Sequence, residues 1–261
     1  MKLKTRCQLE YYSTQETPLI LLLQLFRGLP YVIIEETLTI EPAILIRRYV
    51  DTYGNSCLRL ITPIGKLVIS TSAIVQAEEY IAVDIDAKFT LIQDLPDEAI
   101  VYLLPSRFCE SDKLNSLAFS IIQNIFNSGY QMVAAICQWV NRNIKYEHNT
   151  STSITSALDT LSSQHGVCRD LSHLAIALCR SINIPARFVV GYLYLLRPMD
   201  LHAWFEVYLD GKWYTFDATQ LTLTGGRVVL AYGRDAADVA IATYFGNIQL
   251  QNMEVSVEKI A

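Results

Sequence analysis

The sequence has little positive charge and no long apolar run, and both shortages exclude large classes of protein. Basic residues number 21 against 26 acidic residues, and the formal net charge is −5. A chain without a basic patch offers no electrostatic surface for nucleic acid. The longest apolar run, residues 18–23, is too short to cross a membrane, and the N-terminus lacks the apolar core of a secretory signal. We therefore expect a soluble, cytoplasmic protein without a nucleic-acid or membrane partner.

Closely spaced cysteines are absent as well. None of the six cysteines forms a C-x-x-C pair, which leaves zinc-ribbon and thioredoxin-like sites without support. We expect no metal and no cofactor, and we expect most cysteines to lie in the core of a reduced protein. Apolar residues make up 51% of the 261 residues, enough for one large domain or two modest ones. The cysteines are Cys7, Cys57, Cys109, Cys137, Cys168 and Cys179.

Residues 1–95 have the pattern of an antiparallel β-domain. Short apolar or alternating segments are separated by turn residues, as in a β-sandwich or a barrel-like module. The segments predicted as strands are residues 2–12, 19–26, 31–41, 44–50, 57–61, 67–75 and 80–86. This region contains no set of residues that could carry out catalysis, so we interpret it as an accessory domain.

The composition changes at residues 94–105, which contain two prolines. We place the domain boundary here, between an N-terminal β-domain of residues 1–95 and a second domain of residues 96–261. The predicted helices of the second domain cover residues 112–125, 132–144, 155–161 and 168–182, and its predicted strands cover residues 186–196, 202–209 and 212–217. Helices packed on an antiparallel sheet give an α+β domain.

Cys168 lies in the first turn of a predicted helix, just after Gly166. Asn183 and Pro185 end that helix. The apolar residues at helical spacing are Leu171, Leu174, Ala175, Leu178 and Ile182. Unpaired N–H groups and the positive end of the helix dipole both favour a thiolate at this position. The sequence therefore makes Cys168 a candidate nucleophile, and the alternative is a cysteine that only packs in the core.

The dipeptide Asp210-Gly211 predicts a two-residue hairpin turn between strands 202–209 and 212–217. In that register Asp217 lies opposite Trp204, which makes His202 and Asp217 diagonal neighbours on one face. Their backbones would then be about 7–8 Å apart, close enough for an imidazole to meet a carboxylate. The face opposite to His202 is apolar and should pack on a core; it carries Ala203, Phe205, Val207, Tyr214 and Phe216.

A reactive cysteine needs a base, and that base needs an acceptor that orients it. His202 and Asp217 can supply both to Cys168, provided that the cysteine helix packs on the face of the hairpin that carries them. The alternative is a histidine and an aspartate at a sheet edge, satisfied by the backbone or by water.

The remaining histidines give weaker bases. His173 is five positions beyond Cys168 and points away around the helix axis, and His165 has no carboxylate nearby in the sequence. His148 lies in a polar loop, where we expect it to be solvated. A zinc site of Cys168, His173 and His202 is also conceivable, but the spacing matches no common ligand pattern.

Taken together, these segments resemble the bacterial transglutaminase-like superfamily, whose members are often described as cysteine proteases. The resemblance covers nearly the whole chain, including the N-terminal β-domain. The matching segments are residues 166–174, Ile184-Pro185-Ala186-Arg187, residues 190–193, His202-Ala203-Trp204, Phe216-Asp217-Ala218-Thr219 and Gly233-Arg234-Asp235. Pro is more common in the family where this chain has Ala218.

The resemblance implies a papain-like α+β core in which Cys168 is the nucleophile, His202 the base and Asp217 its orienting acceptor. We expect acyl transfer from peptide or glutamine-type amides through a thioester, with a protein or peptide substrate and with hydrolysis slightly favoured. Transfer to an amine, as in a transglutaminase, and a non-catalytic peptide-binding module are the alternatives. The candidates for the second oxyanion donor, beside the Cys168 N–H, are Gln164, Trp204 and Tyr146.

Overall fold

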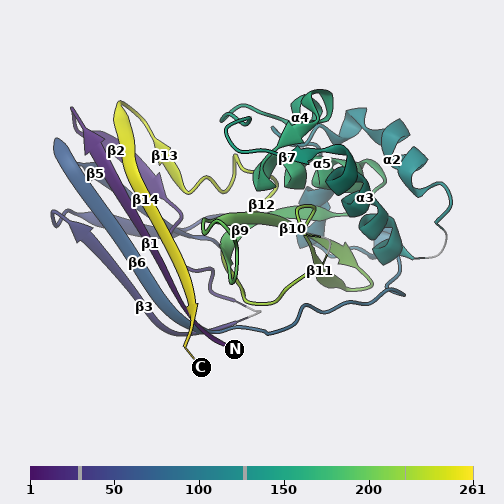
Figure 1. Cartoon of the computed structure of the whole chain (residues 1–261), viewed down its shortest axis with the longest axis horizontal. Helices are drawn as coiled ribbons and strands as arrows, with labels where there is room; N and C mark the ends of the chain where they lie inside the picture. The colour runs from purple at the N-terminus through teal and green to yellow at the C-terminus, as the bar shows by residue number, and fades with distance from the viewer. Residues whose placement is uncertain (29–30, 126–127, 221, 261) are drawn as a thin grey trace.

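The computed structural model describes residues 1–28, 31–125, 128–220 and 222–260. Figure 1 shows a strand-rich unit at the left and a unit with all the long helices at the right. The fold is α+β with antiparallel sheets, as predicted. No helix in these four ranges is long and apolar enough to span a membrane.

The strand-rich unit contains two four-stranded antiparallel sheets, with strand orders β14-β1-β6-β3 and β13-β2-β5-β4. The strands are β1 (Lys2–Ser13), β2 (Thr17–Leu21), β3 (Val32–Glu41), β4 (Ile46–Val50), β5 (Ser56–Thr62), β6 (Gly65–Gln76), β13 (Ala242–Tyr244) and β14 (Ile248–Lys259). Alternate residues of β1 and β6 are buried, because successive side chains of a strand point to opposite faces. Both sheets thus bury one face, as the alternation in the sequence predicts.

The strand pairing differs from the predicted division into residues 1–95 and 96–261. The last strand, β14, returns to the first unit and pairs along the whole of β1, and β13 pairs with β2. β14 covers the edge of β1 that β6 leaves free, so its backbone groups find partners there. The strand predicted at residues 80–86 is wrong: this stretch has no strand partner and runs on as an extended connection.

The second unit is built on one antiparallel sheet with strand order β11-β10-β9-β12. We call it the catalytic sheet because it carries His202, the base predicted from the sequence. Its strands are β9 (Ala186–Leu193), β10 (His202–Leu209), β11 (Lys212–Phe216) and β12 (Arg227–Gly233), and two short parallel strands, β7 (Lys145–Tyr146) and β8 (His165–Gly166), pair beside it. The helices are α1 (Asp97–Ile100), α2 (Asn115–Ile122), α3 (Gly129–Asn143), α4 (Ala157–Ser163) and α5 (Cys168–Ser181).

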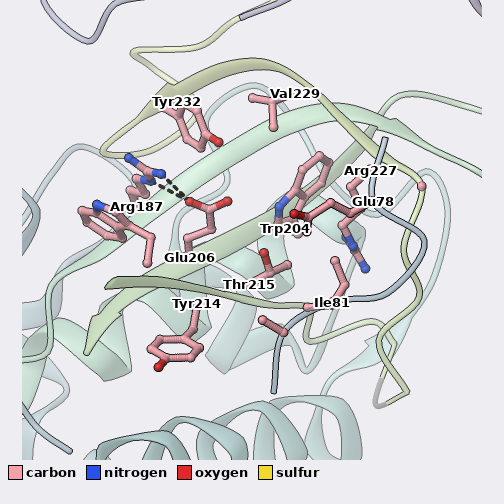
Figure 2. A pocket seen from close by; sticks show the side chains of 13 residues that line it. Glu78, Ile81, Arg187, Trp204, Glu206, Tyr214, Thr215, Arg227, Val229 and Tyr232 are labelled. Carbon is pink, nitrogen blue, oxygen red and sulfur yellow. Dashed lines mark hydrogen bonds and ion pairs between the residues drawn. The ribbon is translucent and has the colours of Figure 1, made fainter. Parts of the chain in front are cut away.

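Helices cover one face of the catalytic sheet, which we call the helix face. α5 packs on β9 and β10, and the ring of His173 on α5 lies 4.9 Å from that of Phe188, which pairs with Phe205. The opposite face, called the back face here, carries Trp204 and Glu206. The connection after β6 runs over this back face, where Glu78 and Ile81 line a pocket with residues of the sheet (Figure 2). Both faces of β10 are therefore buried.

A buried asparagine joins the strand-rich unit to β12. The Asn55 amide donates to the Tyr232 carbonyl at 2.7 Å and accepts from the Tyr232 N–H at 2.8 Å. Asn55 is completely buried, so both bonds lie out of water. The Tyr31 hydroxyl adds a bond of 2.6 Å to the Val229 carbonyl. These contacts fix β12, the strand of the catalytic sheet nearest to the sandwich.

Candidate active site

Cys168 is the first residue of α5, where the sequence predicts it. Val167 precedes the helix in an extended conformation, with φ −111° and ψ −177°. The buried carboxylate of Asp170 accepts a hydrogen bond of 2.9 Å from the Val167 N–H. A Cβ on Gly166 would lie 2.8 Å from the Asp170 Cβ, so only glycine fits this turn. The helix begins abruptly at Cys168. The N–H groups of Asp170 and Leu171 donate to the Val167 carbonyl, both at 3.0 Å, so only those of Cys168 and Arg169 precede the first bond of the helix.

The other oxygen of Asp170 ties a neighbouring loop to the start of α5. Asp170 Oδ1 accepts hydrogen bonds of 2.9 Å from the Ser151 hydroxyl and 3.1 Å from Arg169 Nε. Arg169 also donates to the Thr152 carbonyl. Because the Asp170 carboxylate is fully buried, these contacts hold the Cys168 turn and the loop after β7 as one rigid assembly.

His202 and Asp217 meet as the hairpin register predicts. Leu209 pairs with Lys212 and Phe205 with Phe216, which places His202 at the start of β10 and Asp217 just beyond β11. His202 Nε2 and Asp217 Oδ2 are 2.7 Å apart, and their side chains are 3% and 0% exposed. The imidazole is therefore held by a carboxylate through Nε2, which leaves Nδ1 for another partner.

Cys168 lies beside this imidazole, in the cleft that both side chains line. Burial lowers the pKa of His202, but its interactions with Asp217 and Cys168 outweigh burial and raise the pKa to about 9. An imidazole with a pKa near 9 is protonated at neutral pH. The charged form of His202 is therefore the favoured one.

Asp217 stays ionised because its carboxylate is saturated with donors. Burial raises its pKa, but the hydrogen bond and charge of His202, the charge of Arg227 and the hydrogen bond from Thr219 together hold that pKa well below its usual range. Oδ1 accepts 2.9 Å and 2.6 Å bonds from the Thr219 N–H and hydroxyl. Asn141 on α3 anchors the following Ala218 carbonyl at 2.9 Å.

α5 packs on a different face of the hairpin from the one predicted. We expected α5 to pack on the hairpin face that carries His202, whereas α5 lies on the opposite, apolar face, against Phe188 and its partner Phe205. Contact is still made, because Cys168 is the first residue of its helix and His202 the first residue of its strand. The two side chains meet at the end of the catalytic sheet, beyond its packed faces.

A cleft of about 310 Å³ opens at this meeting point and is lined by Cys168 and His202. Other residues that line it include Tyr146, His148, Arg197, Asp200, Thr219 and Gln220. Tyr146 and Cys168 both line this cleft. Burial, together with the neighbouring Cys168, raises the pKa of Tyr146 to about 12, so this hydroxyl is a neutral donor at neutral pH.

Of the three predicted oxyanion donors, the structure brings only Tyr146 to the cleft. Gln164 ends α4 with an exposed side chain and does not line the cleft. Trp204 is buried on the back face, with its ring 6.2 Å from that of His202 and inclined by 24°. Trp204 lies on the face of β10 that the hairpin register predicts, but it packs in the interior of that face and does not line the cleft at the sulfur.

The alternative bases are placed elsewhere. His173 is buried between Phe108 and Phe188, and its Nε2 accepts the Ala236 N–H at 3.1 Å. Desolvation holds the pKa of His173 well below its usual value, so it stays neutral. His165 lies on β8 and does not line the cleft. A zinc site of Cys168, His173 and His202 is therefore not assembled.

Arg227, which donates to the Asp217 carboxylate from β12, is not among the residues predicted from the sequence. The signal was present: Gly225-Gly226 precedes Arg227 and an apolar run that ends at Gly233, which is the pattern of a buried strand. A single arginine at the start of such a strand is unusual, because arginine is rarely fully buried without a partner. That rarity could have singled it out.

Comparisons with known proteins point to one superfamily. A family model described as the transglutaminase-like superfamily matches residues 115–218, a span that includes Cys168, His202 and Asp217. The crystal structure described as that of a "Putative Cysteine Protease" from Cytophaga hutchinsonii is 36% identical to this chain, with a TM-score of 0.92. The match covers 100% of this chain and 91% of that one.

The relatives found by sequence are described as uncharacterised proteins. An uncharacterised protein from Mycobacterium leprae is 28% identical over 213 residues, which is 76% of this chain and 75% of that protein. An uncharacterised protein from Mycobacterium bovis is 32% identical over 109 residues, 36% of this chain and 35% of that protein. The first of these matches extends well beyond the residues that the family model covers.

Proposed function

Because the chain belongs to the transglutaminase-like superfamily, whose members include cysteine-dependent enzymes, we propose that Cys168, His202 and Asp217 form its catalytic triad. The proposed reaction is acyl transfer from a peptide or glutamine-type amide. The observation that carries this proposal is the buried 2.7 Å contact between Asp217 and His202, with Cys168 in the cleft that His202 also lines. A histidine so oriented can serve a nucleophile as base and a leaving group as acid.

In the first half of the reaction, the Cys168 thiolate attacks the amide carbonyl carbon and forms a C–S bond. The electron pair of the C=O bond moves to oxygen and gives a tetrahedral oxyanion. His202, as imidazolium, then gives its proton to the leaving nitrogen, the C–N bond breaks, and an amine or ammonia departs. The product is a thioester on Cys168 and a neutral His202, whose orientation Asp217 maintains.

In the second half, neutral His202 takes a proton from water while the water oxygen attacks the thioester carbon. The C–S bond breaks, and the thiolate and imidazolium are restored beside a carboxylic acid product. An amine in place of water gives a new amide by the same proton movements. We favour hydrolysis because water needs no acceptor site, and because the structural relative from Cytophaga hutchinsonii is described as a cysteine protease.

The Cys168 N–H and the Tyr146 hydroxyl together are the proposed oxyanion hole. Tyr146 lines the same cleft as Cys168, so both donors can face a carbonyl held beside the sulfur. A carbonyl oxygen bound between them would take one hydrogen bond from each as negative charge develops. Tyr146→Phe should lower turnover about 10²-fold or more while leaving substrate affinity nearly unchanged, since the bond strengthens only in the transition state.

The nucleophile is tested by replacing cysteines on the same helix. Cys168→Ala should abolish turnover of a casein-type protein substrate and labelling by iodoacetamide. Cys179→Ala is the matched control, because Cys179 is the other cysteine of α5 and is fully buried. Equal turnover in the Cys168→Ala variant and the wild type would disprove the proposed function. A wild-type thiol no more reactive than free cysteine would favour the peptide-binding alternative.

Hydrolysis and transfer are separated by one incubation with a glutamine-containing protein and a fluorescent primary amine. Incorporation of the fluorescent amine would show transfer. Release of ammonia, or cleavage of the chain without incorporation, would show hydrolysis, which is the expected result. Cys168→Ala, run in parallel, gives the background for both readouts.

A further inference from the structure

Arg227 sends its side chain across the back face of the catalytic sheet to Asp217. The strand order β11-β10-β9-β12 places two strands between them. Gly191 on β9 pairs with both His202 and Val229, so it lies in the path between the two side chains. A Cβ on Gly191 would lie only 2.9 Å from the Trp204 ring. The missing side chain at Gly191 therefore gives Trp204 room on the face that Arg227 crosses.

The environment of Arg227 is not one that stability alone would select. Nη2 donates to Asp217 Oδ2 at 3.0 Å, Nε donates to the Thr224 carbonyl at 3.3 Å, and the guanidinium lies 5.0 Å from the Trp204 ring centre. Its side chain is 4% exposed, yet Nη1 has no hydrogen-bond partner within the described residues. A buried cation with an unsatisfied N–H destabilises a core, so its presence here points to another role.

Arg227 donates its hydrogen bond to the same Asp217 oxygen that contacts His202. Asp217 Oδ2 accepts from both His202 Nε2 and Arg227 Nη2, whereas Oδ1 is occupied by Thr219. Arg227 thus prevents the carboxylate from rotating about its axis. The positive charge of Arg227 also offsets part of the negative charge of Asp217, which would otherwise act on the imidazole alone.

We propose that Arg227 is a positioning residue of the triad, which holds Asp217 Oδ2 toward His202 and limits the negative charge that His202 experiences. The inference rests on the proposed function but is tested separately from it. Figure 2 shows Arg227 on the back face, in the same pocket wall as Trp204. Arg227 touches neither the cleft nor the sulfur, so it acts only through Asp217.

Other titratable groups also face His202, and each of them contributes to the titration of its imidazole. Cys168 approaches from α5 and Tyr146 from β7. His148, from the loop after β7, and Asp200, from the loop before β10, line the same cleft. A substitution at Arg227 leaves all of these side chains in place. A change in the titration of His202 would therefore report the contact between Arg227 and Asp217.

Removing the guanidinium charge should raise the pKa of His202. In Arg227→Met, Oδ2 keeps only His202 as a strong donor, and a positive charge near the imidazole is lost. Both changes favour the protonated imidazole, so we expect its titration midpoint to rise by about one pH unit. The alkaline inflection in the rate of Cys168 alkylation by iodoacetamide should move in the same direction.

The experiment is a pH titration of the full chain labelled with ¹⁵N-histidine, followed by NMR. The four histidines give few signals, and the His202 signals are assigned by their loss in His202→Gln. Arg227→Met and Arg227→Gln remove the charge, and Arg227→Lys restores it. Arg187→Met is the matched control, because Arg187 forms a comparable ion pair with Glu206 on the same face, at 2.8 Å, without touching the triad (Figure 2).

The expected result is an upward shift in Arg227→Met and Arg227→Gln, a smaller shift in Arg227→Lys, and none in Arg187→Met. If Arg227→Met does not fold, Arg227→Gln decides alone. An unchanged His202 titration in a folded neutral variant overturns the proposal, and so does the failure of both neutral variants to fold, since the role would then be structural. None of these readings requires turnover, so a failure of the proposed function, seen with Cys168→Ala, stays distinguishable.

Discussion

The two faces of the catalytic sheet are both buried, but they have different chemistry. The helix face is apolar, with Phe188, Phe205 and Phe216 packed beneath α3 and α5. The back face holds two arginine–carboxylate pairs, Arg187 with Glu206 and Arg227 with Asp217. Apolar packing stabilises without strict direction, whereas buried ion pairs fix orientation and contribute little net stability. We infer that the helix face holds the sheet together and that the back face orients His202.

The strongest test of this division is Asp217→Asn, which keeps the shape of the back face and removes the negative charge of Asp217. The amide cannot stabilise an imidazolium, so turnover should fall by about 10²–10⁴-fold. The measurement is kcat/KM together with the thermal unfolding midpoint. Asp238→Asn, at a remote aspartate paired with Arg234, is the control and should keep full activity. A folded Asp217→Asn variant with half of the wild-type turnover would contradict the assignment.

Gly191→Ala should affect both the stability of the sheet and the orientation of His202, because a Cβ added at Gly191 has no room between β12 and the Trp204 ring. The added Cβ would lie 2.2 Å from the Val228 carbonyl oxygen and 2.9 Å from the Trp204 ring. We expect a loss of about 3 kcal/mol in the free energy of unfolding, together with a changed His202 titration. Urea unfolding measures the first. Gly211→Ala, where a Cβ meets nothing within 4 Å but φ is +81°, measures the backbone cost of replacing a glycine without a steric clash. Wild-type stability in Gly191→Ala would show that the strands can separate freely here.

Phe205→Leu changes the helix face only. The substitution should lower the free energy of unfolding by about 1–2 kcal/mol through lost packing, because Phe205 is completely buried. Its side chain points away from the back face, so the His202 titration midpoint should stay within error of the wild type. Chemical denaturation and the NMR titration check the two halves. A shifted midpoint in this variant would mean that the faces are coupled.

The smallest effect is expected from pH alone. The folded-state pKa of His202, about 9, lies above its ordinary value of 6.5, because its interactions with Asp217 and Cys168 outweigh burial. The stability that the His202–Asp217 pair contributes to the folded state is therefore complete below pH 6.5 and is lost as the pH rises through 9. Turnover, which needs the imidazolium proton, should be halved near pH 9. A rate that keeps rising beyond pH 10 would argue against His202 as the acid.

Local rules predict the parts of the site that depend on neighbouring residues. The Asp210-Gly211 turn sets the hairpin register, and the period-2 alternation then places His202 beside Asp217. The apolar spacing after Gly166 likewise places Cys168 at a helix start. These predictions are correct because each needs only one turn or one helix.

Contacts between distant segments lie beyond such rules. The face on which α5 packs depends on how the apolar surfaces of several elements fit, and a single helix or hairpin does not specify it. Arg227 meets Asp217 only because β12 is the fourth strand in the order, a topology that no local pattern encodes. The polar sequence of β14 gives little sign of a strand, because that strand lies at a sheet edge with most of its residues exposed.

The pairing of β14 with β1 has a consequence for how the molecule is assembled during synthesis. β1 pairs with β14, a strand that is made only after all the strands of the catalytic sheet, and Figure 1 shows the two chain ends side by side. Until β14 has been made, that edge of β1 remains without this partner, although β6 can already pair with the other edge. Completion of the sheet that contains β1 therefore follows the emergence of the whole catalytic sheet from the ribosome.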